Sequence, residues 1–117
     1  YKKEGLFDFV YAGDVAEGLM RLAASKEANG IYNLATGKAQ RVSNILEVLQ
    51  QHFPNMKTIE KEIDIPYEGS EANIEKIEKT LGWKPWRMLA DAIPLMIEHE
   101  KKYGYQEEEI KDRFSLW

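Results

Sequence analysis

The spacing of hydrophobic positions changes several times along the chain, and each change predicts a new element of secondary structure. Residues 8–11 (DFVY) form a short extended run, and a helix capped by Asp14 is expected directly after it. Its inward face is expected to hold Val15, Leu19, Leu22 and Ala23. The apolar stretch 31–36 (IYNLAT), closed by Gly37, predicts a second short strand.

The second half of the chain is predicted to be mostly helical. Its expected elements are a helix capped by Ser43 and stopped by Pro54, an alternating strand at 58–65, a helix from about 73 to Gly82, and a last long helix containing Pro94. Pro94 predicts that the last helix is kinked or begins late. Residues 106–117 are expected to be a solvated tail. The pattern indicates an α/β fold of mixed helices with a few short strands.

Composition narrows the classes of function. The length of 117 residues fits one domain, and the formal net charge of -4 offers no basic surface for nucleic acid. No apolar run approaches the roughly 20 residues that cross a bilayer, so no membrane partner is expected. The chain has no cysteine, which excludes disulfides and thiolate chemistry and agrees with a cytoplasmic location.

Residues that carry chemistry do not form a recognisable constellation. The glycines make no Gly-x-Gly pair, so no dinucleotide fingerprint or phosphate loop is present. The only histidines, His52 and His99, belong to no spaced metal-ligand pattern, and no serine has a partnering histidine and carboxylate at a familiar spacing. The sequence therefore predicts no catalytic, cofactor-binding or metal-ligating residue within the chain.

Three segments together resemble a known family. They are DFVYAGDVAEGL (8–19), GIYNLATGKAQRVSNILEVL (30–49) and ANIEKIEKTLGWKP (72–85). In this order and spacing they are similar to the C-terminal third of NAD-dependent epimerase/dehydratases, the extended short-chain dehydrogenase/reductases that act on nucleotide sugars.

The resemblance implies that residues 1–117 are the C-terminal, substrate-binding portion of a Rossmann-type enzyme. Its N-terminal Rossmann half would lie upstream and bind most of the NAD or NADP. The family's Tyr-x-x-x-Lys pair is absent, because no tyrosine of this chain has a lysine four positions later. The intact parent would be an isomerase or oxidoreductase, whereas this chain alone is expected to be inactive and, with surface left uncovered, to self-associate.

The same resemblance implies a site for a nucleotide-sugar ligand. The candidate substrate-binding residues are Phe7, Phe9, Tyr11, Asn33, Thr36 and Tyr67. Phe9 and Asn33 match family positions, and the other four are assigned by proximity to them.

Two departures from the family pattern support an alternative function. Phe7 stands where the family often has an arginine that contacts the ligand diphosphate, and the stretch 64–71 (DIPYEGSE) lacks the second family arginine. Loss of two guanidinium contacts weakens diphosphate binding. The alternative is a non-catalytic binding or interaction module that kept the fold and lost nucleotide-sugar chemistry.

Overall fold

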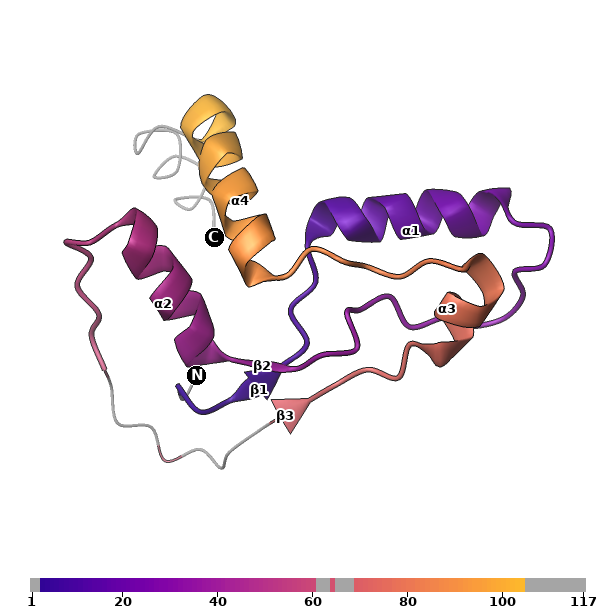
Figure 1. The fold of residues 1–117 in the computed structure, drawn as a ribbon, viewed down its shortest axis with the longest axis horizontal. Helices are drawn as coiled ribbons and strands as arrows, with labels where there is room; N and C mark the ends of the chain where they lie inside the picture. Colours follow the sequence, from indigo (N-terminus) through magenta and orange to yellow (C-terminus); the bar gives the residue numbers. More distant parts are fainter. Residues whose placement is uncertain (1–2, 61–63, 65–68, 105–117) are drawn as a thin grey trace, which may run out of the picture.

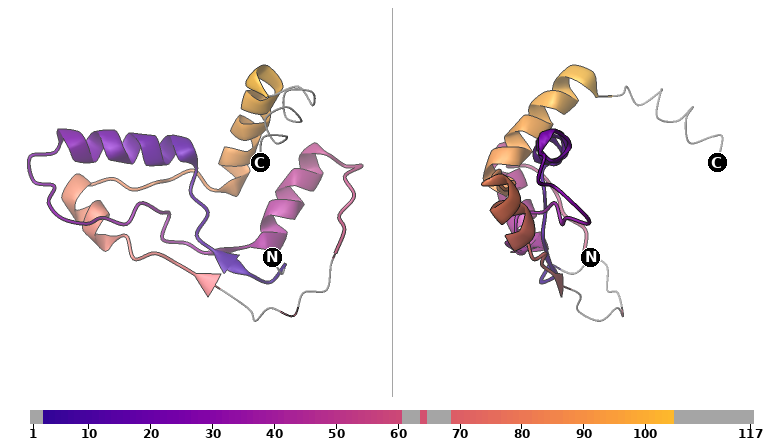
Figure 2. Two further views of the ribbon diagram at one scale, coloured as in Figure 1. Left: turned by 180° about the vertical axis from the view of Figure 1, so that it is seen from behind. Right: turned by 90° about the vertical axis from the view of Figure 1, so that its right-hand side faces the viewer.

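The computed structural model describes residues 3–60, 64 and 69–104, and Figure 1 shows their arrangement. In chain order the elements are β1 (Leu6–Phe7), α1 (Ala12–Ala24), β2 (Gln40–Arg41), α2 (Val42–His52), β3 (Gly69–Ser70), α3 (Glu75–Leu81) and α4 (Leu89–Tyr103). Helices α1 and α3 lie together at one end of the molecule, and α2 packs against α4 at the other (Figures 1 and 2). The predicted mixed α/β class with a few short strands is confirmed.

A small sheet joins the two ends of the molecule. Its strand order is β2-β1-β3, so the earliest strand lies in the centre. Strand β1 runs antiparallel to β2, with Phe7 opposite Gln40, and parallel to β3, with Phe7 opposite Ser70. The sheet therefore brings together three segments that are far apart in the sequence. Its central strand ends at Phe7, immediately before residues 8–11.

The predicted strands differ from the observed ones. The strand expected at 8–11 lies at Leu6–Phe7 instead, and 31–36 contains no strand. Residues 58–60 of the expected strand at 58–65 are also irregular, and most of the remainder lies outside the described residues. A strand exists only where a neighbour pairs with it, and an apolar run in the sequence does not reveal whether that neighbour is present.

The helix starts expected from capping residues are also corrected. Helix α1 begins at Ala12, because the carbonyl of Tyr11 accepts the N–H groups of Asp14 and Val15 at 3.0 and 3.1 Å. Helix α2 begins at Val42, before Ser43. The observed N-cap residues are Tyr11 and Arg41, so the predicted caps at Asp14 and Ser43 were wrong by three residues and two residues, within the range in which sequence patterns place a helix end.

The predicted helix ends are confirmed. Helix α2 stops before Pro54, and α3 is followed by Gly82 in the left-handed conformation, with φ at 58°. Helix α4 begins at Leu89 and continues through Pro94, so the alternative of a late start was wrong, and the alternative of a kink at Pro94 stays a prediction. Pro94 lies beyond the first turn, so it cannot donate an N–H to the carbonyl of Ala90 four residues earlier.

The main core lies between α1 and α3. Ala35, Ile74 and Ile77 are buried there, and Leu22, Leu34 and Trp83 are among the side chains that pack against them. Gly18 of α1 faces this core. A Cβ at that position would come within 2.4 Å of Leu34 Cδ2, so only glycine allows α1 to approach this closely.

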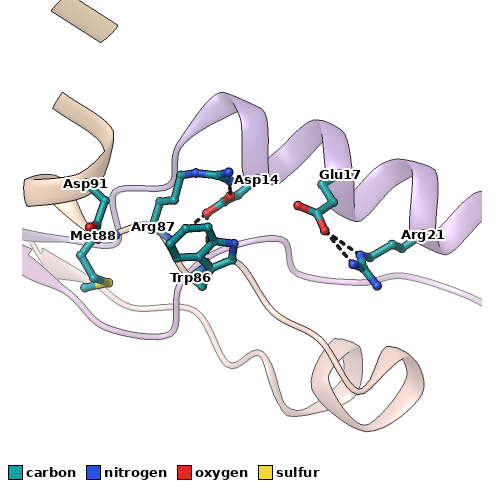
Figure 3. A network of polar contacts seen from close by, with 7 residues as sticks. All are labelled: Asp14, Glu17, Arg21, Trp86, Arg87, Met88 and Asp91. Carbon is teal, nitrogen blue, oxygen red and sulfur yellow. Dashed lines mark hydrogen bonds and ion pairs between the residues drawn. The ribbon is translucent and has the colours of Figure 1, made fainter. Parts of the chain in front are cut away.

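Asp14 fixes the first turn of α1 to the connector before α4. Its side chain is fully buried, and one carboxylate oxygen accepts the backbone N–H groups of Trp86 and Arg87 at 3.1 and 2.9 Å. The other oxygen accepts a hydrogen bond from the guanidinium of Arg87, which stacks over Trp86 at 4.3 Å (Figure 3). The carboxylate that was expected to cap a helix instead joins two segments distant in sequence.

Replacing Asp14 by alanine is expected to lower the free energy of unfolding by about 3–5 kcal/mol, because three donors lose their acceptor. In urea unfolding, the double variant Asp14→Ala/Arg87→Ala should cost less than the sum of the two single changes. Glu17→Ala is the matched control on the same helix. It breaks only the exposed pair with Arg21 and should cost less than about 1 kcal/mol. Equal losses for Asp14→Ala and Glu17→Ala would contradict this role.

Gly37 and Gly82 both have positive φ, at 70° and 58°, but differ in their surroundings. A Cβ at Gly82 meets nothing within 4 Å, whereas one at Gly37 would lie 2.8 Å from two carbons of Ile74. Gly82→Ala should therefore cost about 1–2 kcal/mol, from backbone strain alone. Gly37→Ala should cost more, and urea unfolding of the two variants compares them. A smaller loss of unfolding free energy for Gly37→Ala would show that the side chain of Ile74 moves to accommodate the new methyl group.

Candidate functional site

Asp8 organises the region where the candidate residues meet. Its Oδ1 accepts hydrogen bonds from the backbone N–H and the hydroxyl of Thr36 at 2.9 and 2.5 Å. Its Oδ2 accepts the N–H groups of Gly37 at 2.8 Å and Ala72 at 3.4 Å. One half-buried carboxylate therefore holds residues 36–37 and the segment before α3 against the end of β1.

The aromatic candidates follow one another along the segment that Asp8 holds. The rings of Phe7 and Phe9 meet edge to face, with their centroids 6.0 Å apart. Tyr11 lies farther along, where the guanidinium of Arg87 sits 5.5 Å from its ring centre. All three rings are half-buried, so each keeps some surface for a ligand.

The candidates of the second segment differ in how accessible they are. Asn33 is exposed, and its Nδ2 donates to the carbonyl of Asn73 at 3.0 Å. Thr36 is only 4% exposed, and its hydroxyl is already bonded to Asp8. Tyr67 lies outside the described residues. The structure thus brings Thr36 to the Phe7–Phe9 segment through Asp8, and it directs Asn33 toward the segment before α3.

The start of the segment that holds Asn33 and Thr36 is anchored to α3. The phenol of Tyr32 lies 3.3 Å from the hydroxyl of Thr80 and accepts the N–H of Asn29 at 3.1 Å. These two hydrogen bonds, with a smaller contribution from the ammonium of Lys76, lower the pKa of Tyr32 below its ordinary value. The same ammonium donates to the carbonyls of Asn29 and Ile31, both at 2.9 Å, so α3 fixes the start of the segment, while Asp8 fixes its end at residues 36–37.

A shallow cavity of about 350 Å³ opens beside this segment. Its lining residues are Gly37, Glu71, Ala72, Asn73, Ile74, Glu75 and Glu78. Three carboxylates and no cation line it, although Lys79 and Lys84 pair with Glu75 and Glu78 from outside the lining. The lining itself therefore offers no cationic partner to the diphosphate of a nucleotide sugar.

Two residues of the site, Asp8 and Gln40, were not predicted from the sequence. Asp8 was assigned to a strand, although a carboxylate between apolar residues is a signal of buried hydrogen bonding. Gln40 lies directly opposite Phe7, and its Nε2 is buried with no hydrogen-bond partner among the described residues. No sequence signal marks Gln40, because its position follows from the pairing of β1 with β2.

Other kinds of site find no support in the part of the chain that the structure describes. No group of three or more histidine, aspartate or glutamate side chains there has the arrangement to hold a metal ion. Among the same residues, no helix has both the length and the apolar character that crossing a membrane requires.

The arrangement of elements matches solved structures of sugar-nucleotide enzymes. UDP-glucose 4-epimerase from Bifidobacterium longum, solved with NAD+ and UDP, has a TM-score of 0.74 and 22% identity over 87% of this chain. The enzyme WbmF from Bordetella bronchiseptica, solved with NAD+, has a TM-score of 0.69 and 26% identity over 86% of this chain. The chain has the fold of one part of these enzymes.

The match covers only part of each of these solved proteins. This chain spans about a third of the length of these proteins, 32% for the Bifidobacterium enzyme and 30% for WbmF. A second UDP-glucose 4-epimerase, from Thermotoga maritima with UDP-glucose bound, matches with a TM-score of 0.73 and 24% identity, and this chain spans 33% of its length. No protein-family model matches the chain, and no curated protein matches it by sequence.

Replacing Asp8 by asparagine should loosen residues 36–37, because an amide NH2 group would face N–H donors that now meet an oxygen. Hydrogen bonds to a charged group contribute about 1.5–3 kcal/mol, so urea unfolding should show a loss of about that size. The amide proton resonances of Thr36 and Gly37 should shift most. Glu47→Gln, an exposed position of α2, is the control with the same charge change. Unchanged resonances at 36–37 would contradict the role of Asp8.

Proposed function

We propose that this chain is the substrate-side portion of an NAD(P)-dependent nucleotide-sugar epimerase, dehydratase or reductase. The observation that carries the proposal is the match of most of the chain to about a third of several epimerases that were solved with NAD+, UDP or UDP-glucose. The three sequence segments similar to the family lie in the matching order. The cofactor, NAD or NADP, would be held mainly by residues that this chain does not contain.

The proposed substrate-binding residues are Phe7, Phe9, Tyr11, Asn33, Thr36 and Tyr67. Half-buried aromatic rings offer flat apolar surface to a base or to the C–H groups of a sugar, which suits Phe7 and Phe9. The exposed amide of Asn33 would supply a polar contact from the side of the segment before α3, where its Nδ2 donates to the carbonyl of Asn73. Thr36 would act through the backbone it fixes, since its hydroxyl is bound to Asp8.

This chain supplies no group for the chemical step. Hydride transfer in the resembled family depends on a tyrosine with a lysine four positions later, and no such pair is present. The isolated chain is therefore proposed to be inactive, and its part is to bind and orient the substrate.

One observation favours the alternative of a non-catalytic module. Directly opposite residues of paired strands point to the same face of a sheet, and successive residues alternate. Arg41 lies opposite Leu6, so it shares that residue's face and leaves the face of Phe7 to the uncharged Gln40. The exposed Arg41 thus does not replace the cation that the family has at the position of Phe7.

Titration of the isolated chain with UDP-glucose, followed by amide NMR, tests the proposal. Shifts should concentrate at residues 7–11 and 33–37, and Phe9→Ala should weaken them without unfolding the chain. NAD+ should cause no tight binding, and no sugar epimerisation should be detected. Gln50→Glu, on an exposed turn of α2, is the control that should leave the titration unchanged.

The possible results separate the two functions. Shifts that are equally large with UDP-glucose, UDP and unrelated anions would reject a nucleotide-sugar site. A complete absence of shifts would favour the non-catalytic module. Measurable turnover by the chain alone would contradict both.

A further inference from the structure

Arg87 is held at the junction between α1 and the connector before α4 by one end of its guanidinium. Its Nη1 donates a hydrogen bond to Oδ1 of the fully buried Asp14, and its backbone N–H donates to the other oxygen of the same carboxylate at 2.9 Å. The guanidinium lies over the ring of Trp86, 4.3 Å from the ring centre (Figure 3). The carboxylate and the ring together restrain the orientation of this cation.

The other edge of the Arg87 guanidinium is available to a ligand. A guanidinium binds an oxyanion most strongly through two parallel N–H groups on one edge. Within the described part of the chain only Nη1 of Arg87 meets an acceptor, which leaves the edge formed by Nε and Nη2 without one. The side chain is 25% exposed, so it is not sealed from solvent.

Arg21 of α1 resembles Arg87 but has no free edge. It also pairs with a carboxylate and lies near a tryptophan, 5.3 Å from the ring centre of Trp83. Its Nε and Nη2, however, both contact Oε1 of Glu17, at 2.9 and 2.8 Å (Figure 3). The edge that is free in Arg87 is therefore occupied in Arg21.

Arg87 also lies beside the candidate substrate-binding segment. Its guanidinium is 5.5 Å from the ring centre of Tyr11, which is half-buried and two residues beyond Phe9. At the start of this segment position 7 carries an uncharged ring, and Arg41 shares the opposite face of the sheet. Arg87 thus brings to the far end of the segment the kind of donor that position 7 lacks.

We propose that the free edge of the Arg87 guanidinium binds a phosphate group of the ligand, which makes Arg87 a further substrate-binding residue of this chain. The inference rests on the proposed function for the identity of the ligand as a sugar nucleotide. The Asp14–Arg87 pair has no net charge, so the contact depends on hydrogen bonds from a guanidinium that is already oriented. Trp86 is a positioning residue, because its ring lies against the guanidinium and leaves the free edge in place.

The charge of the chain makes this site distinguishable from general attraction of anions. The formal net charge is -4, so the chain as a whole repels a phosphate. A response to phosphate that is confined to Arg87 and its neighbours would therefore report hydrogen bonding at one place.

Titration of the full 117-residue chain with inorganic pyrophosphate and with UDP, followed by NMR of the backbone amides and the arginine Nε–H groups, tests the proposal. The Nε–H resonance of Arg87 should shift with both probes, and that of Arg21 should not. Arg87→Lys keeps the charge that Asp14 needs but removes the parallel pair of donors, so it should weaken both probes about tenfold or more. Arg21→Lys is the matched control and should leave both affinities unchanged.

Trp86→Ala is a second variant, which keeps the test decisive if Arg87→Lys fails to fold. Its backbone N–H still donates to Asp14, so the fold should be kept, while loss of the ring over the guanidinium should weaken pyrophosphate about two- to fivefold. An unmoved Arg87 Nε–H resonance in the folded chain would overturn the proposal. So would an equal loss of affinity in Arg21→Lys, or a Trp86→Ala chain that binds pyrophosphate as tightly as before.

The same titrations separate this inference from the proposed function. Shifts with UDP-glucose at residues 33–37 and none at Arg87 would overturn the phosphate site and leave the proposed function standing. Shifts at Arg87 with pyrophosphate and UDP, with no further effect of the glucose unit at residues 7–11 and 33–37, would keep the phosphate site and reject the nucleotide-sugar function.

Discussion

The carboxylate of Asp8 is the constraint on which the candidate site depends. The three segments around it, residues 8–11, 31–37 and 71–74, have almost no regular secondary structure. The nearby sheet has only two residues in each strand. Four hydrogen-bond donors from residues 36, 37 and 72 converge on this one side chain. Because the donors come from separate parts of the chain, one anion holds residues 36–37 and the segment before α3 beside Phe7 and Phe9.

Asp8 and Asp14 divide the organisation of the molecule between them. Asp8 gathers the segments around the candidate site, and Asp14 ties α1 to the connector before α4. Both lie within nine residues of sequence, DFVYAGDVA. This stretch therefore matters to the fold through one buried and one half-buried carboxylate.

Features that depend on neighbouring residues could be predicted from the sequence, and features that depend on residues distant in the chain could not. The ends of α2 and α3 were predicted because Pro54 and Gly82 act through their own backbone. The strands were misplaced because pairing partners are distant in sequence. Asp14 was assigned as a cap by a local rule, while its real partners lie some seventy positions away. The placement of Leu19 and Ala23 on the inner face of α1 was wrong: both are exposed, because the core lies against Gly18 and Leu22, at one border of the broad apolar face of this helix. The candidate ligand residues came from the resemblance, and neither Asp8 nor Gln40 was found.

The way Asp14 is bound has a consequence for how this fold tolerates sequence change. Two of its three contacts are with main-chain N–H groups, those of Trp86 and Arg87. Any residue except proline presents such a group, so these two hydrogen bonds place no demand on the side chain at 86, whereas the buried carboxylate still requires the cation of Arg87. The recognisable LGWKP motif ends at Pro85, one position before the junction. Alignments of related chains would consequently show the acidic residue at 14 varying together with the cation at 87, while the residue at 86, which contributes only its backbone N–H to this junction, varies independently.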